Sequence, residues 1–222
     1  MKCLAVNTAT TILSVALTEG DSVLYHFSTA ETRDQGNLII HHAKAGLQQA
    51  GLGFADLDLL AVVTGPGSFT GIRIGLAALR GMAMAAQKPL IGLSSFDLFA
   101  APVAGGRNII AVESFRQELY FQIDRSAPVN ETPEAFANKV NSDGAPIVIS
   151  GDAAQKLLPF LPHASVCDGL PDAVTLAQRA RRKFETEGEA ATAQRPAPFY
   201  LRPADVTLSD KKTRNVEGME GV

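Results

Sequence analysis

The chain has 222 residues, of which 46% are hydrophobic and 19% are charged, and its formal net charge is −3. This composition fits a globular protein with a substantial core, arranged as one large domain or two smaller lobes. The slight negative charge excludes a global field that attracts nucleic acid, and leaves open only a local basic patch. No apolar run approaches the roughly 20 residues that span a bilayer, so we expect no membrane insertion.

The cysteines and the N-terminus bear on the cellular compartment. The two cysteines, Cys3 and Cys167, lie far apart in the sequence. Cys3 falls in a predicted core strand, so we expect a buried free thiol and a reducing environment. The N-terminus leads straight into that strand and lacks the pattern of a secretion signal. We therefore expect a cytoplasmic protein.

The first half of the chain alternates strand-like and helix-like segments. Short apolar runs predict strands at residues 2–7, 12–17, 22–27, 59–64 and 89–93. Helical spacing of apolar residues, together with capping signals, predicts helices at residues 35–50, 71–86 and 96–101. Tight turns join the first three strands, which predicts an antiparallel meander. This order resembles one lobe of the actin, hexokinase and Hsp70 ATPase (ASKHA) fold, so we expect an α/β lobe of that type over residues 1–101.

The second half of the chain carries weaker signals. It predicts strands at residues 108–112, 118–124, 146–150 and 165–167, and helices at residues 133–138, 153–158 and 175–188. By analogy with the same two-lobed fold, we expect a reduced second lobe over residues 102–204. We find no internal sequence repeat by eye. The polar end of the chain predicts a flexible tail over residues 205–222.

A glycine-rich segment, residues 64–75, connects a predicted strand to a small-residue helix and reads T-G-P-G-S-F-T-G-I-R-I-G. Such a turn can cradle an anion, because free N–H groups and the helix dipole point the same way. The spacing matches neither G-x-x-x-x-G-K-[ST] nor G-x-G-x-x-G, so close packing is the favoured interpretation. The weaker alternative is a nucleotide contact that uses this loop and the hydroxyl-rich turn after residue 7. Its candidate residues are Thr8, Thr10, Gly65, Gly67, Ser68 and Thr70.

The full residue sequence of this segment is more specific than the spacing of its glycines. The stretch G-P-G-S-F-T-G-I-R-I-G-L-A at residues 65–77 resembles the signature of the TsaB (YeaZ) family. Residues 198–203, P-F-Y-L-R-P, resemble the P-x-Y-L-R segment near the C-terminus of the same family. The resemblance implies a non-catalytic scaffold and dimerisation subunit. That subunit supports a TsaD-like enzyme in forming N6-threonylcarbamoyladenosine at position 37 of transfer RNAs that read ANN codons.

The resemblance also implies the partners. It implies a TsaE-like ATPase beside the TsaD-like catalytic subunit, a homodimer as an alternative pairing, and contact with transfer RNA only through the complex. ATP and a metal ion would then belong to the partner subunits, and this chain would hold no cofactor of its own.

Candidate catalytic groups are missing where the fold needs them. Asn7 stands where relatives in this family commonly carry aspartate, and asparagine is no general base. The histidine pair of TsaD aligns with Ser95 and Phe99, and neither side chain replaces an imidazole. We therefore predict no catalytic residue, no metal site and no protease or other enzyme activity. The alternative hypothesis is a stand-alone nucleotide-binding kinase or ATPase of the same fold.

The predicted helix at residues 71–86 carries small residues on almost every side, so it suits packing against two surfaces. The resemblance implies that the first two helices pair with a partner. The candidates on the first helix are Leu38, Ile39, His42 and Gly46, and those on the second are Arg73, Ala77, Gly81 and Met84. Helical phase alone leaves open which side of each helix faces the core.

Overall fold

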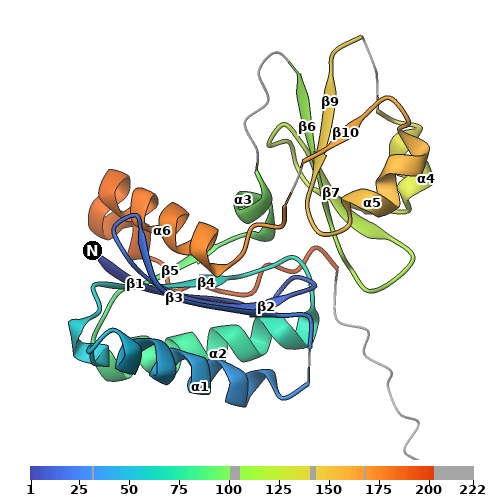
Figure 1. The fold of residues 1–222 in the computed structure, drawn as a ribbon. Coiled ribbons are helices and arrows are strands. Elements are labelled where there is room, and N and C mark those ends of the chain that lie inside the picture. The colour runs from blue at the N-terminus through green and yellow to red at the C-terminus, as the bar shows by residue number, and fades with distance from the viewer. Residues whose placement is uncertain (32, 101–105, 141–143, 168, 203–222) are drawn as a thin grey trace, which may run out of the picture.

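The computed structural model describes residues 1–31, 33–100, 106–140, 144–167 and 169–202. These residues form two lobes, each built on one five-stranded sheet (Figure 1). The predicted tail, residues 205–222, lies outside the described residues. Within the described residues, no helix is long and apolar enough to cross a membrane.

The first lobe is organised around a sheet in the order β3-β2-β1-β4-β5. Its strands are β1 (Lys2–Asn7), β2 (Leu13–Glu19), β3 (Ser22–Thr29), β4 (Leu59–Val63) and β5 (Leu90–Leu93). The first three pair antiparallel, as the predicted meander requires, and β4 and β5 add in parallel to β1. Every residue of β4 is buried, because helices cover both faces of the sheet at this strand.

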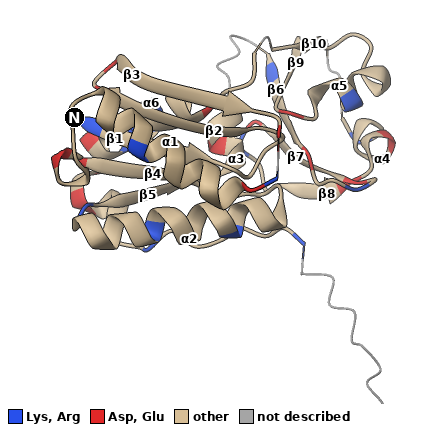
Figure 2. Ribbon diagram, turned by 60° about the horizontal axis from the view of Figure 1, so that its bottom comes forward, with Lys and Arg blue, Asp and Glu red and all other residues tan. Residues whose placement is uncertain are grey.

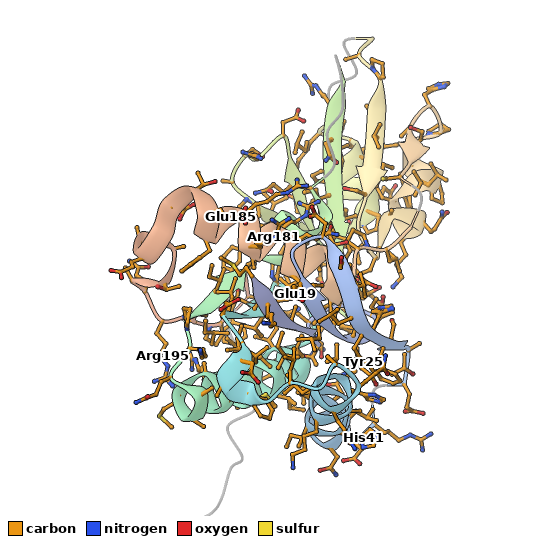
Figure 3. All side chains as sticks on the ribbon, turned by 60° about the vertical axis from the view of Figure 1, so that its left-hand side comes forward. Glu19, Tyr25, His41, Arg181, Glu185 and Arg195 are labelled. Atoms are coloured by element: carbon orange, nitrogen blue, oxygen red, sulfur yellow. The ribbon has the colours of Figure 1, made fainter. Side chains whose placement is uncertain are left out.

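Helices lie on both faces of this sheet. One face carries α1 (Gln35–Gln49) and α2 (Phe69–Ala86), and the other carries α6 (Ala173–Glu187), as Figure 1 shows. Figure 3 labels Tyr25 and His41 on the α1 side of the sheet, and Arg181 and Glu185 on α6. One side of α6 faces this sheet and joins the core of the first lobe. Its residues there are Ala173, Leu176, Ala177 and Ala180. The predicted boundary assigned this helix to the second lobe, and its packing corrects that assignment.

The second lobe has a sheet in the order β10-β9-β6-β7-β8. Its strands are β6 (Arg107–Val112), β7 (Leu119–Ile123), β8 (Val129–Glu131), β9 (Ile147–Ser150) and β10 (Ser165–Val166). Two short helices, α4 (Pro133–Ala137) and α5 (Ala154–Leu157), close one face around Phe121 and Phe136, whose rings stack at 4.0 Å. The other face meets the first lobe through α3 (Ser95–Phe99) and residues 199–201 of the C-terminal segment.

The two sheets repeat the same topology. In each, the first strand pairs antiparallel with the second and the second with the third, and the fourth and fifth add in parallel on the other side. The glycines after the corresponding fourth strands, Gly65 and Gly151, have nearly equal φ angles of 107° and 105°. The structure therefore contains a repeat of two lobes that we did not find in the sequence.

Most predicted elements overlap the observed ones, with differences at their ends. The helix predicted from residue 71 begins at Phe69, because Ser68 caps it by accepting a hydrogen bond from the N–H of Gly71. The helix predicted from residue 175 begins at Ala173 for the same reason, with Asp172 as its cap. The strand β8 and three short 3₁₀ segments were not predicted. These segments are Phe54–Asp56, Leu158–Phe160 and Gly188–Thr192. The prediction of a buried Cys3 is confirmed, and burial raises the pKa of its thiol to about 12.

Candidate partner-binding face and glycine-rich turn

The glycine-rich turn packs directly on the turn that follows β1. A Cβ added at Gly67 would lie 2.0 Å from the carbonyl oxygen of Ala9, and one added at Gly71 would lie 1.9 Å from that of Thr8. The Ser68 N–H donates a hydrogen bond to the carbonyl of Ala9 at 2.7 Å. These glycines allow two segments of backbone to touch, a contact that no other residue type permits.

The polar side chains of the β1 turn brace this contact from inside. The Thr8 hydroxyl donates to the carbonyl of Gly71 at 2.7 Å. The Asn7 amide donates to the Thr10 hydroxyl at 2.7 Å and accepts from the N–H of Ala9. All three side chains are buried. The hydroxyls of Thr8 and Thr10, two of the candidate nucleotide contacts, therefore point into the turn, and a ligand would have to displace these bonds to reach them.

The other candidate nucleotide contacts lie in different surroundings. Gly65 is enclosed by the Ile72 side chain and the Phe199 carbonyl. Gly67, Ser68 and Thr70 line a cavity of about 370 Å³ between the turn, residues 114–116 and residues 199–202. A nucleotide contact in this cavity stays a prediction.

An aromatic and cationic cluster forms the rim of this cavity. The Arg73 guanidinium lies 3.7 Å from the centre of the Phe69 ring and donates to the Tyr200 hydroxyl at 3.0 Å. Phe69 and Tyr200 lie with ring centres 5.1 Å apart. The C-terminal segment that resembles the family motif is thus attached to the first turn of α2. This attachment fixes the Arg73 side chain at one end of the exposed side of α2.

The second-helix candidates share one exposed side of α2. Arg73, Ala77, Gly81 and Met84 all face outward, one turn after another, and the Met84 side chain is 75% exposed. A Cβ added at Gly81 would meet nothing within 4 Å. The buried side of the same helix, with Ile72, Leu76 and Leu79, packs on the sheet. Among the described residues, nothing buries this side of α2, and its role in binding a partner stays a prediction.

The first-helix candidates are placed differently, and two need correction. Ile39 and Gly46 face the sheet, where Ile39 is fully buried and Gly46 lies against the Tyr25 ring. Their side of α1 cannot meet a partner while the helix packs on this sheet. Leu38 is partly buried. The outward side of α1 instead carries Ile40, which is 45% exposed, with the exposed residues His41, Lys44 and Gln48.

His42 lies at the border between the inner and outer sides of α1. Its ring stacks on Phe27 with centres 3.4 Å apart, and its Nδ1 lies 2.6 Å from the Tyr25 hydroxyl oxygen. Burial, with a smaller contribution from the charge of His41, lowers the pKa of His42 below its usual value. Its contacts make it a part of the first lobe as well as a neighbour of the outer face.

We call the exposed sides of α1 and α2 together the outer face. Neither helix contains an acidic residue, and the only Lys and Arg residues are Lys44, Arg73 and Arg80 (Figure 2). The Arg80 guanidinium binds the Pro196 carbonyl, which leaves Lys44 and Arg73 as the more outward charges. The outer face therefore combines the small, mostly apolar side of α2 with a polar side of α1 that carries His41, Lys44 and Gln48. It is weakly positive, and it suits a partner surface with exposed acidic groups.

Comparison with known proteins finds TsaB and TsaD proteins among those that this chain is similar to. A model of TsaD, tRNA N6-adenosine threonylcarbamoyltransferase, matches residues 32–132. The chain is 34% identical over 125 residues to the tRNA threonylcarbamoyladenosine biosynthesis protein TsaB of Escherichia coli, and this match covers 54% of each chain. It is 27% identical over 221 residues to TsaB of Haemophilus influenzae, with 90% of this chain and 92% of the relative covered. The chain is similar to TsaB (YeaZ) proteins over most of its length.

Solved structures agree on the fold. YeaZ from Pseudomonas aeruginosa matches with a TM-score of 0.72 over 90% of this chain and 99% of its own, at 23% identity. An ethanolamine utilization protein, EutJ from Carboxydothermus hydrogenoformans, matches with a TM-score of 0.52 over 81% of this chain, at 12% identity. With the repeated sheets, these matches confirm the expected α/β fold of the ASKHA type.

Three positions singled out by comparison with the TsaB and TsaD families have structural roles here. Asn7 braces the β1 turn. Ser95 is buried, and its hydroxyl donates to the carbonyl of Pro66 at 2.6 Å. Phe99 is buried in the cluster between the lobes. Among the described residues, no three His, Cys, Asp or Glu side chains gather in a way that could hold a metal ion.

Proposed function

We propose that this chain, which is similar to TsaB proteins, is a non-catalytic accessory subunit of N6-threonylcarbamoyladenosine formation in transfer RNA. In this proposal it docks a TsaD-like catalytic subunit through the outer face. The similar TsaB proteins of Escherichia coli and Haemophilus influenzae are named for threonylcarbamoyladenosine biosynthesis, and a TsaD family model matches part of the chain. A TsaE-like ATPase, a homodimer and transfer RNA held through the complex belong to the same proposal.

The observation that carries the proposal is the exposed small-residue side of α2. A helix that packed on its own sheet alone would need one apolar side, with polar residues opposite. Here the outward side carries Ala77, Gly81 and Met84. Small side chains allow two helix backbones to approach closely, and a flexible methionine adapts to the surface that it meets. The geometry suits a helix-to-helix contact with a second protein.

A stand-alone kinase or ATPase is less supported by the same residues. Asn7 supplies no general base. The Thr8 hydroxyl donates to the Gly71 carbonyl of α2, and the Thr10 hydroxyl accepts from the Asn7 amide. The kinase hypothesis requires that the purified chain hydrolyses ATP at an enzyme-like rate and loses this activity when Asn7 or Thr10 is changed. We expect no such hydrolysis.

The proposal is tested by mixing the purified chain with the TsaD-like protein of the same organism and sizing the complex. The decisive variant is Gly81→Arg. Its added side chain projects into open space and replaces a poor helix former, so the isolated chain stays folded. We expect a wild-type complex and a loss of affinity of at least about 100-fold in the variant, because a bulky charge in a tight interface separates the backbones.

Two further variants serve as controls. Gln155→Arg places the same charge on an exposed position of α5 in the second lobe, and should bind like the wild type. Gly46→Arg should unfold the first lobe, because its Cβ already meets the Tyr25 ring at 2.9 Å. A Gly81→Arg chain that binds normally would rule out the outer face as the docking surface. No complex under any nucleotide condition would contradict the accessory role itself.

A further inference from the structure

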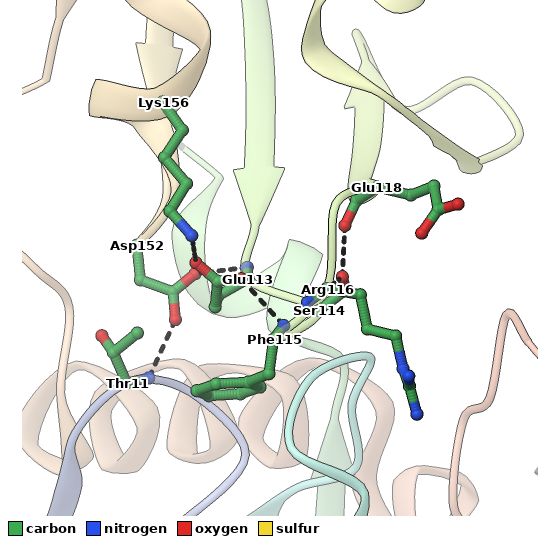
Figure 4. A network of polar contacts seen from close by, with 8 residues as sticks. All are labelled: Thr11, Glu113, Ser114, Phe115, Arg116, Glu118, Asp152 and Lys156. Carbon is green, nitrogen blue, oxygen red and sulfur yellow. Dashed lines mark hydrogen bonds and ion pairs between the residues drawn. The ribbon is translucent and has the colours of Figure 1, made fainter. Parts of the chain in front are cut away.

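Besides the apolar contact between the lobes, one carboxylate accepts hydrogen bonds from both of them. Asp152 follows β9 of the second lobe, and its Oδ1 accepts the N–H of Glu113 from that lobe at 2.9 Å. Its Oδ2 accepts the N–H of Thr11 from the first lobe, also at 2.9 Å (Figure 4). Both oxygens are thus used, and each binds a different lobe.

The two donors lie in corresponding turns of the repeat. Thr11 lies in the turn between the first and second strands of its sheet, and Glu113 opens the corresponding turn after β6. Backbone N–H groups that converge from turns create concave sites for anions. The repeat therefore brings one such donor from each lobe to a common point, and the Asp152 carboxylate occupies that point.

The chemistry of the site favours a single negative charge with two acceptor oxygens. An ionised carboxylate offers two acceptors and no donor, whereas an amide would direct its NH₂ group at one of the N–H donors. Burial raises the pKa of Asp152, and the charge of the buried Glu113 carboxylate adds a smaller increase, whereas the hydrogen bonds from the N–H groups of Glu113 and Thr11 lower it. Glu113 is in turn held by Lys156 and by the N–H of Phe115. A second negative charge at this point would be repelled by Glu113. Lys156, the cation among these groups, already binds Glu113.

We propose that the β1–β2 turn and the β6–β7 turn form a monoanion site shared by the two lobes, and that Asp152 is its built-in ligand. The carboxylate fills the site, holds the lobes at a fixed separation and closes this point of the junction to external anions. The inference concerns the chain by itself and does not depend on the outer face or on any partner. It assigns to Asp152 a ligand's role that its sequence neighbourhood does not indicate.

The test is chemical rescue of an emptied site. In Asp152→Ala, the Thr11 and Glu113 amides lose their acceptor, so thermal unfolding should begin at least about 5 °C lower. Hydrogen exchange at these two amides should be about tenfold faster or more. Sodium formate should restore much of both losses relative to sodium chloride at equal ionic strength. Pyrophosphate should not, because its several charges would face Glu113. Wild-type protein should gain nothing specific from formate.

Matched variants make the result decisive. The Asp58 carboxylate accepts the N–H of Lys2 at 2.6 Å within the first lobe, so Asp58→Ala loses a comparable bond away from the junction. It should show no preference for formate. Asp152→Asn should stay defective, because it offers only one acceptor. Equal effects of formate and chloride on Asp152→Ala would overturn the proposal, as would unchanged exchange at both amides. If Asp152→Ala is unfolded in chloride, formate is added and refolding is measured. A failure to refold in formate would also overturn the proposal.

Discussion

The two sides of α2 use glycine for opposite reasons. On the inner side, Gly71 and Gly75 lie against Thr8, and a Cβ would come within 1.9 Å of its carbonyl oxygen or 2.4 Å of its hydroxyl. On the outer side, Gly81 faces open space. One helix therefore carries glycines that the fold requires and a glycine that the fold does not. The inner glycines explain how two turns meet, and only the outer one needs an explanation from outside the chain.

The largest expected effect comes from filling the inner side. Gly71→Ala would drive its Cβ into the backbone of Thr8, which cannot rotate away as a flexible side chain could. We expect a loss of about 3 kcal/mol or more in the free energy of unfolding. Urea denaturation followed by circular dichroism measures it. A loss below about 1 kcal/mol would mean that the two turns are not in contact in solution.

A smaller loss is expected where the obstacle is a ring and not a backbone. Gly46→Ala on α1 would place a Cβ 2.9 Å from two carbons of the Tyr25 ring. The ring must tilt, which disturbs its hydroxyl contact with His42, and we expect a loss of about 1–3 kcal/mol. Gly36→Ala on the same helix is the matched control, because its Cβ would meet nothing within 4 Å. If both variants unfold at the same urea concentration, α1 does not pack on β3 as described.

How far the sequence could predict these contacts depends on their range. The strand β4 follows from an unbroken apolar run bounded by turn residues, although it was predicted one residue too long. The helix α2 was predicted from residue 71, and it begins two residues earlier because Ser68 caps it. The inner side of α1 was mispredicted in part, since Leu38, Ile39 and Ile40 are three apolar residues in a row. Such a run fits several helical phases, and only the packed sheet decides that Ile39 is buried while Ile40 is exposed.

Contacts between distant segments lay beyond the sequence altogether. The stripe on α6 predicts an amphipathic helix, but it does not say that the chain returns from the second lobe to cover the first sheet. Asp152 and Thr11 are 141 positions apart, and nothing near either residue announces their hydrogen bond. The repeat of the two lobes is likewise a property of strand order and pairing, which different side chains can satisfy equally well.

Filling the outer side should stabilise the isolated chain. Gly81→Ala adds a good helix former at an exposed position without a contact to disturb, so we expect a gain of about 1 kcal/mol. The measurement is urea denaturation at low protein concentration. A loss that grows with protein concentration would show that two copies of the chain already approach each other at Gly81. In that case both sides of α2 would be packed, the inner side against its own sheet and the outer side against a second copy of the chain.

The smallest expected effect concerns His42, which lies where the inner and outer sides of α1 meet. Its folded pKa is lowered from 6.5, so the unfolded chain binds the proton more readily than the folded chain. The neutral imidazole therefore contributes stability that is complete above pH 6.5 and is lost as the pH falls through the folded pKa. His42→Phe keeps an aromatic ring beside Phe27 and should flatten this part of the pH dependence of unfolding.

A second arm separates the two causes of the His42 shift. Because the charge of His41 contributes less than burial, His41→Gln should move the His42 pKa only part of the way towards its usual value. An NMR titration of the His42 ring measures the shift directly in both chains. If the His42 pKa returned fully to its usual value, the ring would be solvated and would belong to the outer side of α1. A partial return would place it with the inner side, where Phe27 and Tyr25 hold it against the sheet.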